Sequence, residues 1–328
     1  MQHEMSQCRL TIDPIDLKCL PKLENKIFVI TGANSGIGKE TAKILSKTGC
    51  TLILGCRRES EGLAVEKEIR SCSGNKKVYF EHLNLASFVS VHSFAEKVLD
   101  RISGENGELY CLVNNAGIFY NKHEVTSDGL NISLQVNYLG PLYLTLLLWP
   151  KLKESSNARI INVTSAAHKL VTETHIEEFF SNELFANGDY DQIPVYGETK
   201  LYVILTSLFQ AKLLKDTNVT VHCIDPGNVA TNVLRYIKEY NTFLTQFLIW
   251  LRFKTAAKAA LEVTSLTLHP LLEGVSGKVW ESFSEETPSS LALSESLAEK
   301  LWIKSLETLS LHANTDLSVY ELLQNPTS

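Results

Sequence analysis

The sequence lacks the features that mark several large classes of protein. Its 31 Lys and Arg residues are outnumbered by 37 Asp and Glu residues, and a net charge of −6 leaves no basic surface for nucleic acid. The seven cysteines form no C-x-x-C pair and the nine histidines no H-E-x-x-H motif, so we expect reduced thiols and no metal site. The first 26 residues hold charges and prolines but no long apolar run, and neither a signal peptide nor a transmembrane anchor is visible. These absences predict a cytoplasmic protein, with peripheral attachment to a membrane or lipid droplet left open.

What the chain does contain is a repeated alternation of strand-like and helix-like patterns. Strand-like segments occur near residues 27–31, 51–56, 77–82, 109–113, 159–164, 219–224 and 278–281, and the first of them is rich in β-branched residues. Helical spacing between them indicates βαβ units. We predict an α/β fold with a single Rossmann-type, doubly wound parallel sheet of about seven strands and helices on both faces. The predicted layout is an N-terminal extension over 1–26, a Rossmann domain over 27–285 and a C-terminal helical extension over 286–328.

A glycine-rich turn lies between the first predicted strand and the first predicted helix. It has the spacing G-x-x-x-G-x-G, with glycines at 32, 36 and 38. Such a turn directs backbone N–H groups and the positive end of a helix dipole at its occupant, and the missing Cβ atoms let a pyrophosphate approach. The turn therefore predicts a dinucleotide site, although three glycines in a turn are also ordinary turn chemistry.

The second predicted strand ends at Arg57-Arg58, where an NAD site would carry an acidic residue for the ribose hydroxyls. A guanidinium at this place suits a 2′-phosphate, so the sequence favours NADP(H) over NAD(H). Lys39 could add to the same charge pocket. The alternative is a solvated arginine pair that opens the helix predicted over 59–70.

Polar residues follow two further strands. Asn84 and Leu85 come after the third strand, and the segment Asn114–Gly117 follows the fourth, where ligands of open α/β sheets bind. An ordinary Asn-Gly turn is the alternative for the second segment. Asn137 lies in a helix predicted over 129–152; Asn is a poor residue for a helix interior, so either a proton relay or a satisfied buried amide would explain it.

Three residues form a candidate catalytic group. Ser165 follows the fifth predicted strand, while Tyr196 and Lys200 are four residues apart and so share one face of a long apolar helix. A nearby ammonium and a nicotinamide cation would lower the pKa of the phenol by about two or three units, which suits proton exchange with an alcohol or carbonyl. Y-x-x-x-K alone is common on helices by chance.

Taken together, these motifs and the segment Pro226–Thr231 resemble the short-chain dehydrogenase/reductase family in order and spacing over about 27–285. The resemblance implies that Tyr196 is the acid/base, Lys200 its electrostatic partner, Ser165 the substrate-orienting residue and Asn137 the anchor of a water relay. The predicted cofactor-binding residues are Gly32, Asn34, Ser35, Gly36, Ile37, Gly38, Arg57, Asn84, Leu85, Asn115, Ala116, Gly117, Tyr196, Lys200, Pro226, Gly227, Val229 and Thr231.

Within the family, the chain is similar to the retinol-dehydrogenase-like branch. It is most similar to the X-linked dehydrogenase/reductase type, which is associated with the oxidoreduction of polyprenol and dolichol. It departs from the family at Asn84, where Asp is usual, and at Asp225, where many relatives have His or Asn. The N-terminal membrane anchor of many retinol dehydrogenases is not visible.

A strongly apolar stretch over 243–253 is too short to span a bilayer. It could form a lid over a pocket or touch a membrane surface, and core packing or a homodimer interface are the alternatives. The prediction is an oxidoreductase with a small lipophilic, retinoid- or polyisoprenoid-like substrate. A steroid or xenobiotic carbonyl reductase and a non-catalytic NADP(H)-binding regulator remain the alternatives.

Overall fold

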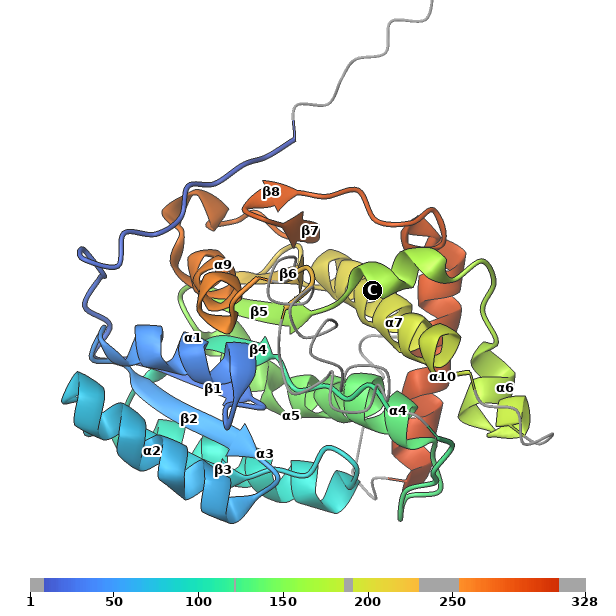
Figure 1. Cartoon of the computed structure of the whole chain (residues 1–328), viewed down its shortest axis with the longest axis horizontal. Coiled ribbons are helices and arrows are strands. Elements are labelled where there is room, and N and C mark those ends of the chain that lie inside the picture. Colours follow the sequence, from blue (N-terminus) through green and yellow to red (C-terminus); the bar gives the residue numbers. More distant parts are fainter. Residues whose placement is uncertain (1–8, 121, 186–190, 230–253, 313–328) are drawn as a thin grey trace, which may run out of the picture.

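The computed structural model describes residues 9–120, 122–185, 191–229 and 254–312. In this part of the chain, eight strands form one sheet in the order β3-β2-β1-β4-β5-β6-β7-β8 (Figure 1). The strands are β1 Lys26–Thr31, β2 Thr51–Cys56, β3 Val78–His82, β4 Glu108–Asn114, β5 Ala158–Val163, β6 Val219–Asp225, β7 Lys278–Glu281 and β8 Ser284–Glu285.

The pairing confirms the predicted α/β fold with a mostly parallel sheet. The first seven strands pair in parallel and agree with the seven predicted strands to within one residue at each end. The two-residue β8 pairs antiparallel to β7 and has no counterpart in the prediction, because its two residues carry no alternating pattern. The strand order reverses between β1 and β4, which is the switch point at which open α/β sheets bind ligands.

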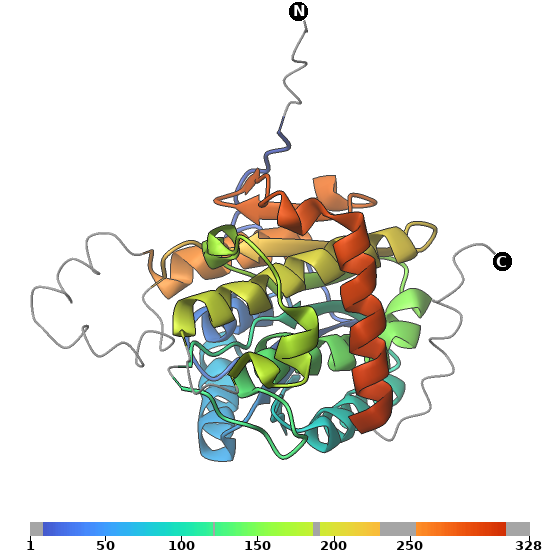
Figure 2. The same ribbon diagram turned by 90° about the vertical axis from the view of Figure 1, so that its right-hand side faces the viewer.

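Helices cover both faces of this sheet. The apolar side chains of α1, α2 and α9 pack on one face, while those of α3, α5 and α7 pack on the other. Figure 2 shows α10 running across the outside of α7. The helices of the described residues are α1 Gly36–Ser46, α2 Glu59–Ser73, α3 Phe88–Glu105, α4 Ile132–Leu134, α5 Gly140–Glu154, α6 Ile176–Phe180, α7 Gln192–Leu213, α9 Ala256–Leu268 and α10 Glu295–His312. Short 3₁₀ turns are η2 Ala166–Leu170, η3 Glu183–Phe185, η6 Pro270–Leu272 and η7 Leu291–Leu293.

The single helix predicted over 129–152 is wrong in detail. Its first turn begins after Asn131, whose side chain caps it by accepting from the N–H groups of Ser133 and Leu134. The next five residues, Gln135–Leu139, form the π-helix η1, and only then does α5 begin. A Cβ atom on Gly140 would stand 2.6 Å from the carbonyl oxygen of Leu85, so tertiary contact holds this junction tightly. Sequence periodicity does not register such a contact.

The described part of the N-terminal segment packs along the β7–β8 hairpin and α9. Ile12 is buried, and its N–H donates to the carbonyl of Phe283 at 3.0 Å. The N–H of Ile15 donates to Ser265 Oγ on α9 at 3.1 Å. Phe283 and its neighbour Ser282 have positive φ angles of 66° and 50°, a conformation that non-glycine residues rarely adopt. The N-terminal segment thus helps to hold a strained turn in place.

His222, in the middle of β6, makes the fold sensitive to acid. It is fully buried and accepts a hydrogen bond at Nδ1 from the indole of Trp280 at 3.1 Å. Burial, assisted by the charge of Arg159, lowers the pKa of His222 to about 3. Because the folded pKa lies below that of the unfolded chain, the unfolded chain binds more protons, and stability is lost as the pH falls below about 6.5.

We therefore expect His222→Asn to reduce this sensitivity, since an amide oxygen can accept from Trp280 but does not titrate. Between about pH 7 and about pH 5, the free energy of unfolding of the unaltered protein should fall by about 2 kcal/mol more than that of the variant. Urea titrations at the two pH values measure the difference. An equal loss in both proteins would contradict the role given to His222.

Candidate active site

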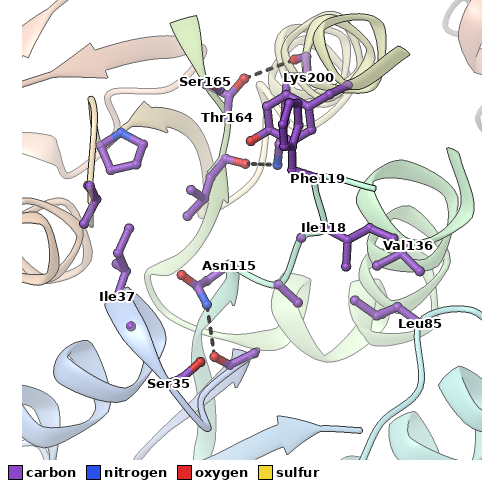
Figure 3. A pocket seen from close by; sticks show the side chains of 18 of the residues that line it. Ser35, Ile37, Leu85, Asn115, Ile118, Phe119, Val136, Thr164, Ser165 and Lys200 are labelled. Carbon is purple, nitrogen blue, oxygen red and sulfur yellow. Dashed lines mark hydrogen bonds between the residues drawn. The ribbon is translucent and has the colours of Figure 1, made fainter. Parts of the chain in front are cut away.

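A cavity of about 500 Å³ lies at the carboxyl ends of the central strands (Figure 3). Its volume is in the range of cofactor and small-molecule sites. The ends of β1, β2, β4, β5 and β6 all contribute to it, together with the first turn of α1 and the start of α7. It therefore occupies the position that the strand order at the switch point predicts.

The glycine turn forms a cradle on one side of the cavity. Gly32 has φ +68°, and a Cβ atom there would stand 2.9 Å from Cα of Ala116. A Cβ atom on Gly38 would stand 2.5 Å from Nδ2 of Asn115, the amide that donates to the Thr31 carbonyl at 2.8 Å. The side chain of Ser35 does not cap α1, so the first-turn N–H groups remain available to an anion. A pyrophosphate fits this cradle of backbone donors.

Most of the residues predicted to bind a cofactor line this cavity. They are Gly32, Asn34, Ser35, Gly36, Ile37, Arg57, Asn84, Leu85, Asn115, Ala116, Gly117, Tyr196, Lys200, Pro226, Gly227 and Val229. Gly38 lies behind the lining, where its missing side chain lets α1 approach Asn115. Thr231 and the apolar stretch 243–253 lie outside the described residues.

Arginines 57 and 58 line the end of the cavity next to β2. Within the described residues Arg57 makes no ion pair, whereas Nη1 of Arg58 lies 2.9 Å from a carboxylate oxygen of Glu61. Lys39 does not contribute a charge here as the sequence suggested, because its Nζ is held 2.7 Å from Glu68 on α2. Lys39 is also not among the residues that line the cavity.

Ser165, Tyr196 and Lys200 all line the cavity between the end of β5 and α7, and Figure 3 shows Ser165 and Lys200 on the side opposite Ser35. The helix already begins at Gln192, one turn before Tyr196, with Asp191 as its cap. Lys200 is buried, and its Nζ donates to the Val163 carbonyl at 3.0 Å and lies 5.7 Å from the centroid of the Tyr196 ring. The ammonium therefore faces the phenol without a direct bond to it.

The pKa values of this pair differ from the expected ones. Burial raises the pKa of Tyr196 to about 12, and a hydrogen bond from Ser165 acts in the opposite direction. Burial also lowers the pKa of Lys200 to about 8. In the protein without a cofactor, desolvation therefore exceeds the attraction between two groups that are not in contact. The predicted acidification concerns the phenol beside a bound nicotinamide cation and stays a prediction.

Asn137 lies behind the lining, on the π-helix η1. Its Oδ1 accepts from the N–H of Ile118 at 2.7 Å, and its Nδ2 donates to the Ile118 carbonyl at 2.9 Å and to Thr199 Oγ1 at 3.2 Å. A Cβ atom on Gly117 would stand 3.4 Å from both Asn137 Oδ1 and Lys200 Nζ. The amide is therefore a satisfied one that ties the segment after β4 to α7, directly beside the lysine.

Comparison with known proteins identifies the family. A family model for short chain dehydrogenases matches residues 26–175. Retinol dehydrogenase 13 of Mus musculus is 36% identical over 293 residues, covering 88% of this chain and 85% of that protein. Retinol dehydrogenase 11 of Homo sapiens is 35% identical over 292 residues, covering 88% and 87%. This chain belongs to the short-chain dehydrogenase/reductase family.

Solved structures share the fold at lower identity. An uncharacterized protein of Mycobacterium paratuberculosis superimposes with a TM-score of 0.70 at 22% identity, covering 91% of this chain and 98% of that one. A short chain dehydrogenase of Burkholderia cenocepacia in complex with NADP gives 0.61 at 20% identity, covering 79% and 97%. Family membership makes this chain an oxidoreductase related to retinol dehydrogenases, with an NAD(P)(H) type of cofactor, which the glycine cradle fits.

Three neighbours of the catalytic group were not among the site residues predicted from the sequence. The ring of Phe119 contacts that of Tyr196 edge-on at 5.1 Å between centroids. Asp225, noted only as a departure, lines the cavity and its charge acts on both Tyr196 and Lys200. His168 is buried and donates from Nδ1 to the Ser165 carbonyl at 2.7 Å, while its Nε2 accepts from the N–H of Ser289. Of the three, only Phe119 could have been suspected from the sequence, because it belongs to the apolar pair that directly follows the segment Asn114–Gly117.

In the part of the chain that the structure describes, none of the helices combines the length and apolar character needed to cross a bilayer. Over the same residues, no group of three or more His, Cys, Asp or Glu side chains is placed to hold a metal ion.

Proposed function

We propose that the chain is an NADP(H)-dependent oxidoreductase that interconverts the alcohol and the carbonyl form of a lipophilic, retinoid- or polyisoprenoid-like substrate. The observation that carries the proposal is the meeting of Ser165, Tyr196 and Lys200 on one wall of a cavity whose opposite side is the glycine cradle. The cofactor, when bound, supplies or accepts the hydride. The protein's part is to orient the substrate oxygen and to move its proton.

In this proposal Tyr196 is the proton donor for carbonyl reduction. Its raised pKa keeps the phenol protonated at neutral pH, and the Ser165 hydroxyl beside it holds the same substrate oxygen. Lys200, still cationic below about pH 8, stabilises the phenolate that remains after the proton has left. Asn137 keeps the segment around Gly117 close to Lys200 and so acts as a positioning residue.

The surroundings of Arg57 support the preference for NADP(H). Arg57 lines the cavity at the carboxyl end of β2 and, among the described residues, has no acidic partner to neutralise it. A free guanidinium at this place can bind a 2′-phosphate through paired hydrogen bonds.

The apolar part of the lining supports a lipophilic substrate. Leu85, Ile118 and Val136 lie together on one side of the cavity (Figure 3). At its rim, Ile193 is 52% exposed despite its apolar side chain, and Phe119 stands against Tyr196. An apolar chain that leaves its oxygen at Tyr196 would cover these surfaces.

A turnover screen tests the proposal. The full-length protein is assayed with NADPH and with NADH against retinal, polyprenal and a set of steroid ketones, and NADPH binding is measured separately by fluorescence. We expect reduction of an unsaturated lipid aldehyde, faster with NADPH. Turnover of steroid ketones alone would overturn the substrate class. NADPH binding without turnover of any carbonyl would favour a non-catalytic regulator.

A further inference from the structure

Glu61 is an acidic residue beside the position proposed for the 2′-phosphate, where a negative charge is not expected. It lies in the first turn of α2, just beyond the two arginines that follow β2. One carboxylate oxygen accepts from Nδ2 of Asn34 at 2.6 Å, and the other lies 2.9 Å from Nη1 of Arg58. Asn34 and Arg58 both line the cavity. The carboxylate therefore connects the glycine turn to the arginine pair at this end of the site.

The two arginines differ in their ion pairing. The Arg58 guanidinium is engaged by Glu61, whereas Arg57 has no ion pair within the described residues. The side chains of Arg58 and Glu61 are 51% and 37% exposed, so water and salt screen their attraction. A dianionic phosphate with several acceptor oxygens is a stronger partner for a guanidinium than a screened carboxylate. A phosphate can therefore displace Glu61 from Arg58, but the carboxylate of Glu61 then remains next to that phosphate.

We propose that Glu61 weakens the preference for NADP(H) over NAD(H) that the two arginines would produce alone. It does so by restraining Arg58 and by placing a negative charge beside the position of the 2′-phosphate. The inference rests on the proposed use of NADP(H) through Arg57. A dinucleotide without the phosphate leaves the Asn34–Glu61–Arg58 contacts intact. A dinucleotide with the phosphate must either break them or tolerate the carboxylate.

Glu61→Gln is the decisive variant, because the amide can still accept from Asn34 but carries no charge. We expect the affinity for NADPH, relative to NADH, to rise about tenfold at low ionic strength and the gain to shrink in about 0.5 M salt. Binding of NADPH and NADH is followed by fluorescence, and binding of 2′-AMP and 5′-AMP by calorimetry, so that no result depends on turnover. An unchanged or lower ratio would overturn the proposal.

Two further variants separate the possible causes. Glu59→Gln removes the same charge from the same helical turn, but Glu59 is exposed and is not bonded to Asn34 or Arg58; it should leave the ratio unchanged. In an Arg58→Ala background the effect of Glu61→Gln should become smaller, since part of it acts through Arg58. An equal effect of Glu59→Gln would mean general electrostatics and would overturn the specific role.

Arg57→Ala distinguishes this inference from the proposed function. If it lowers NADPH affinity while Glu61→Gln changes nothing, NADP(H) recognition stands and the role of Glu61 fails. If Arg57→Ala has no effect on NADPH or 2′-AMP, the assignment of phosphate recognition to Arg57 fails instead, whatever Glu61→Gln does.

Discussion

Replacing Tyr196 by Phe should lower carbonyl turnover by about 10³-fold or more, because the substrate oxygen then has no proton donor at this wall. The ring and its edge contact with Phe119 remain, and so does the glycine cradle on the other side of the cavity. NADPH affinity should therefore change less than about threefold. Single-turnover assays and NADPH fluorescence titrations on the same preparation measure the two quantities.

A matched control is available on the same helix. Tyr202 is buried in α7 and donates its hydroxyl to Glu198 at 2.6 Å, away from the cavity lining. Tyr202→Phe removes the same atom and should cost stability while leaving turnover per folded molecule nearly unchanged. Retained turnover in Tyr196→Phe, with folding confirmed, would refute the acid/base assignment.

The fold could be predicted from the sequence because its determinants are local. Each central strand is a short, largely apolar run, and each glycine of the turn stands where a side chain would clash or where φ is positive, as at Gly32. Parallel pairing then brings the carboxyl ends of the strands to one edge, so polar residues far apart in sequence could be expected to share a cavity.

What could not be predicted depends on contacts between distant segments. The expected helix is divided into α4, η1 and α5, and Gly140 at the last junction lies close to the backbone of Leu85. Helical periodicity carries no information about such a contact. The link from Ser165 through His168 to Ser289 joins residues more than 100 positions apart. The hydrogen bond from Asn34 to Glu61 likewise depends on the packing of α2 against the glycine turn, whereas the Arg58–Glu61 ion pair is a local contact between residues three apart.

The direction of the pKa shifts is the clearest such case. The sequence places an amine and a phenol one helical turn apart, which suggests mutual stabilisation of their charged forms. The structure buries both and turns the Lys200 ammonium toward the Val163 carbonyl. Desolvation then favours the neutral form of each group, and the two pKa values move apart, to about 12 for Tyr196 and about 8 for Lys200.

This arrangement predicts that carbonyl reduction declines in mildly alkaline solution. The pKa of Lys200, lowered from its usual value to about 8, means that the cationic form is complete only well below that pH and is lost as the pH rises through it. Because the cation stabilises the phenolate left by proton transfer, kcat/KM for NADPH should be level near neutral pH. It should then fall about tenfold per unit above about pH 8.

Lys200→Met should lower kcat/KM by about 10²-fold near neutral pH and abolish this alkaline decline, because no titrating ammonium remains beside the phenol. Lys200→Arg keeps a charge that does not titrate in this range and should move the decline to higher pH even if its longer side chain lowers the rate. A decline that stays near pH 8 in Lys200→Met would show that another group titrates there, and the role of Lys200 as the charged partner of Tyr196 would have to be given up.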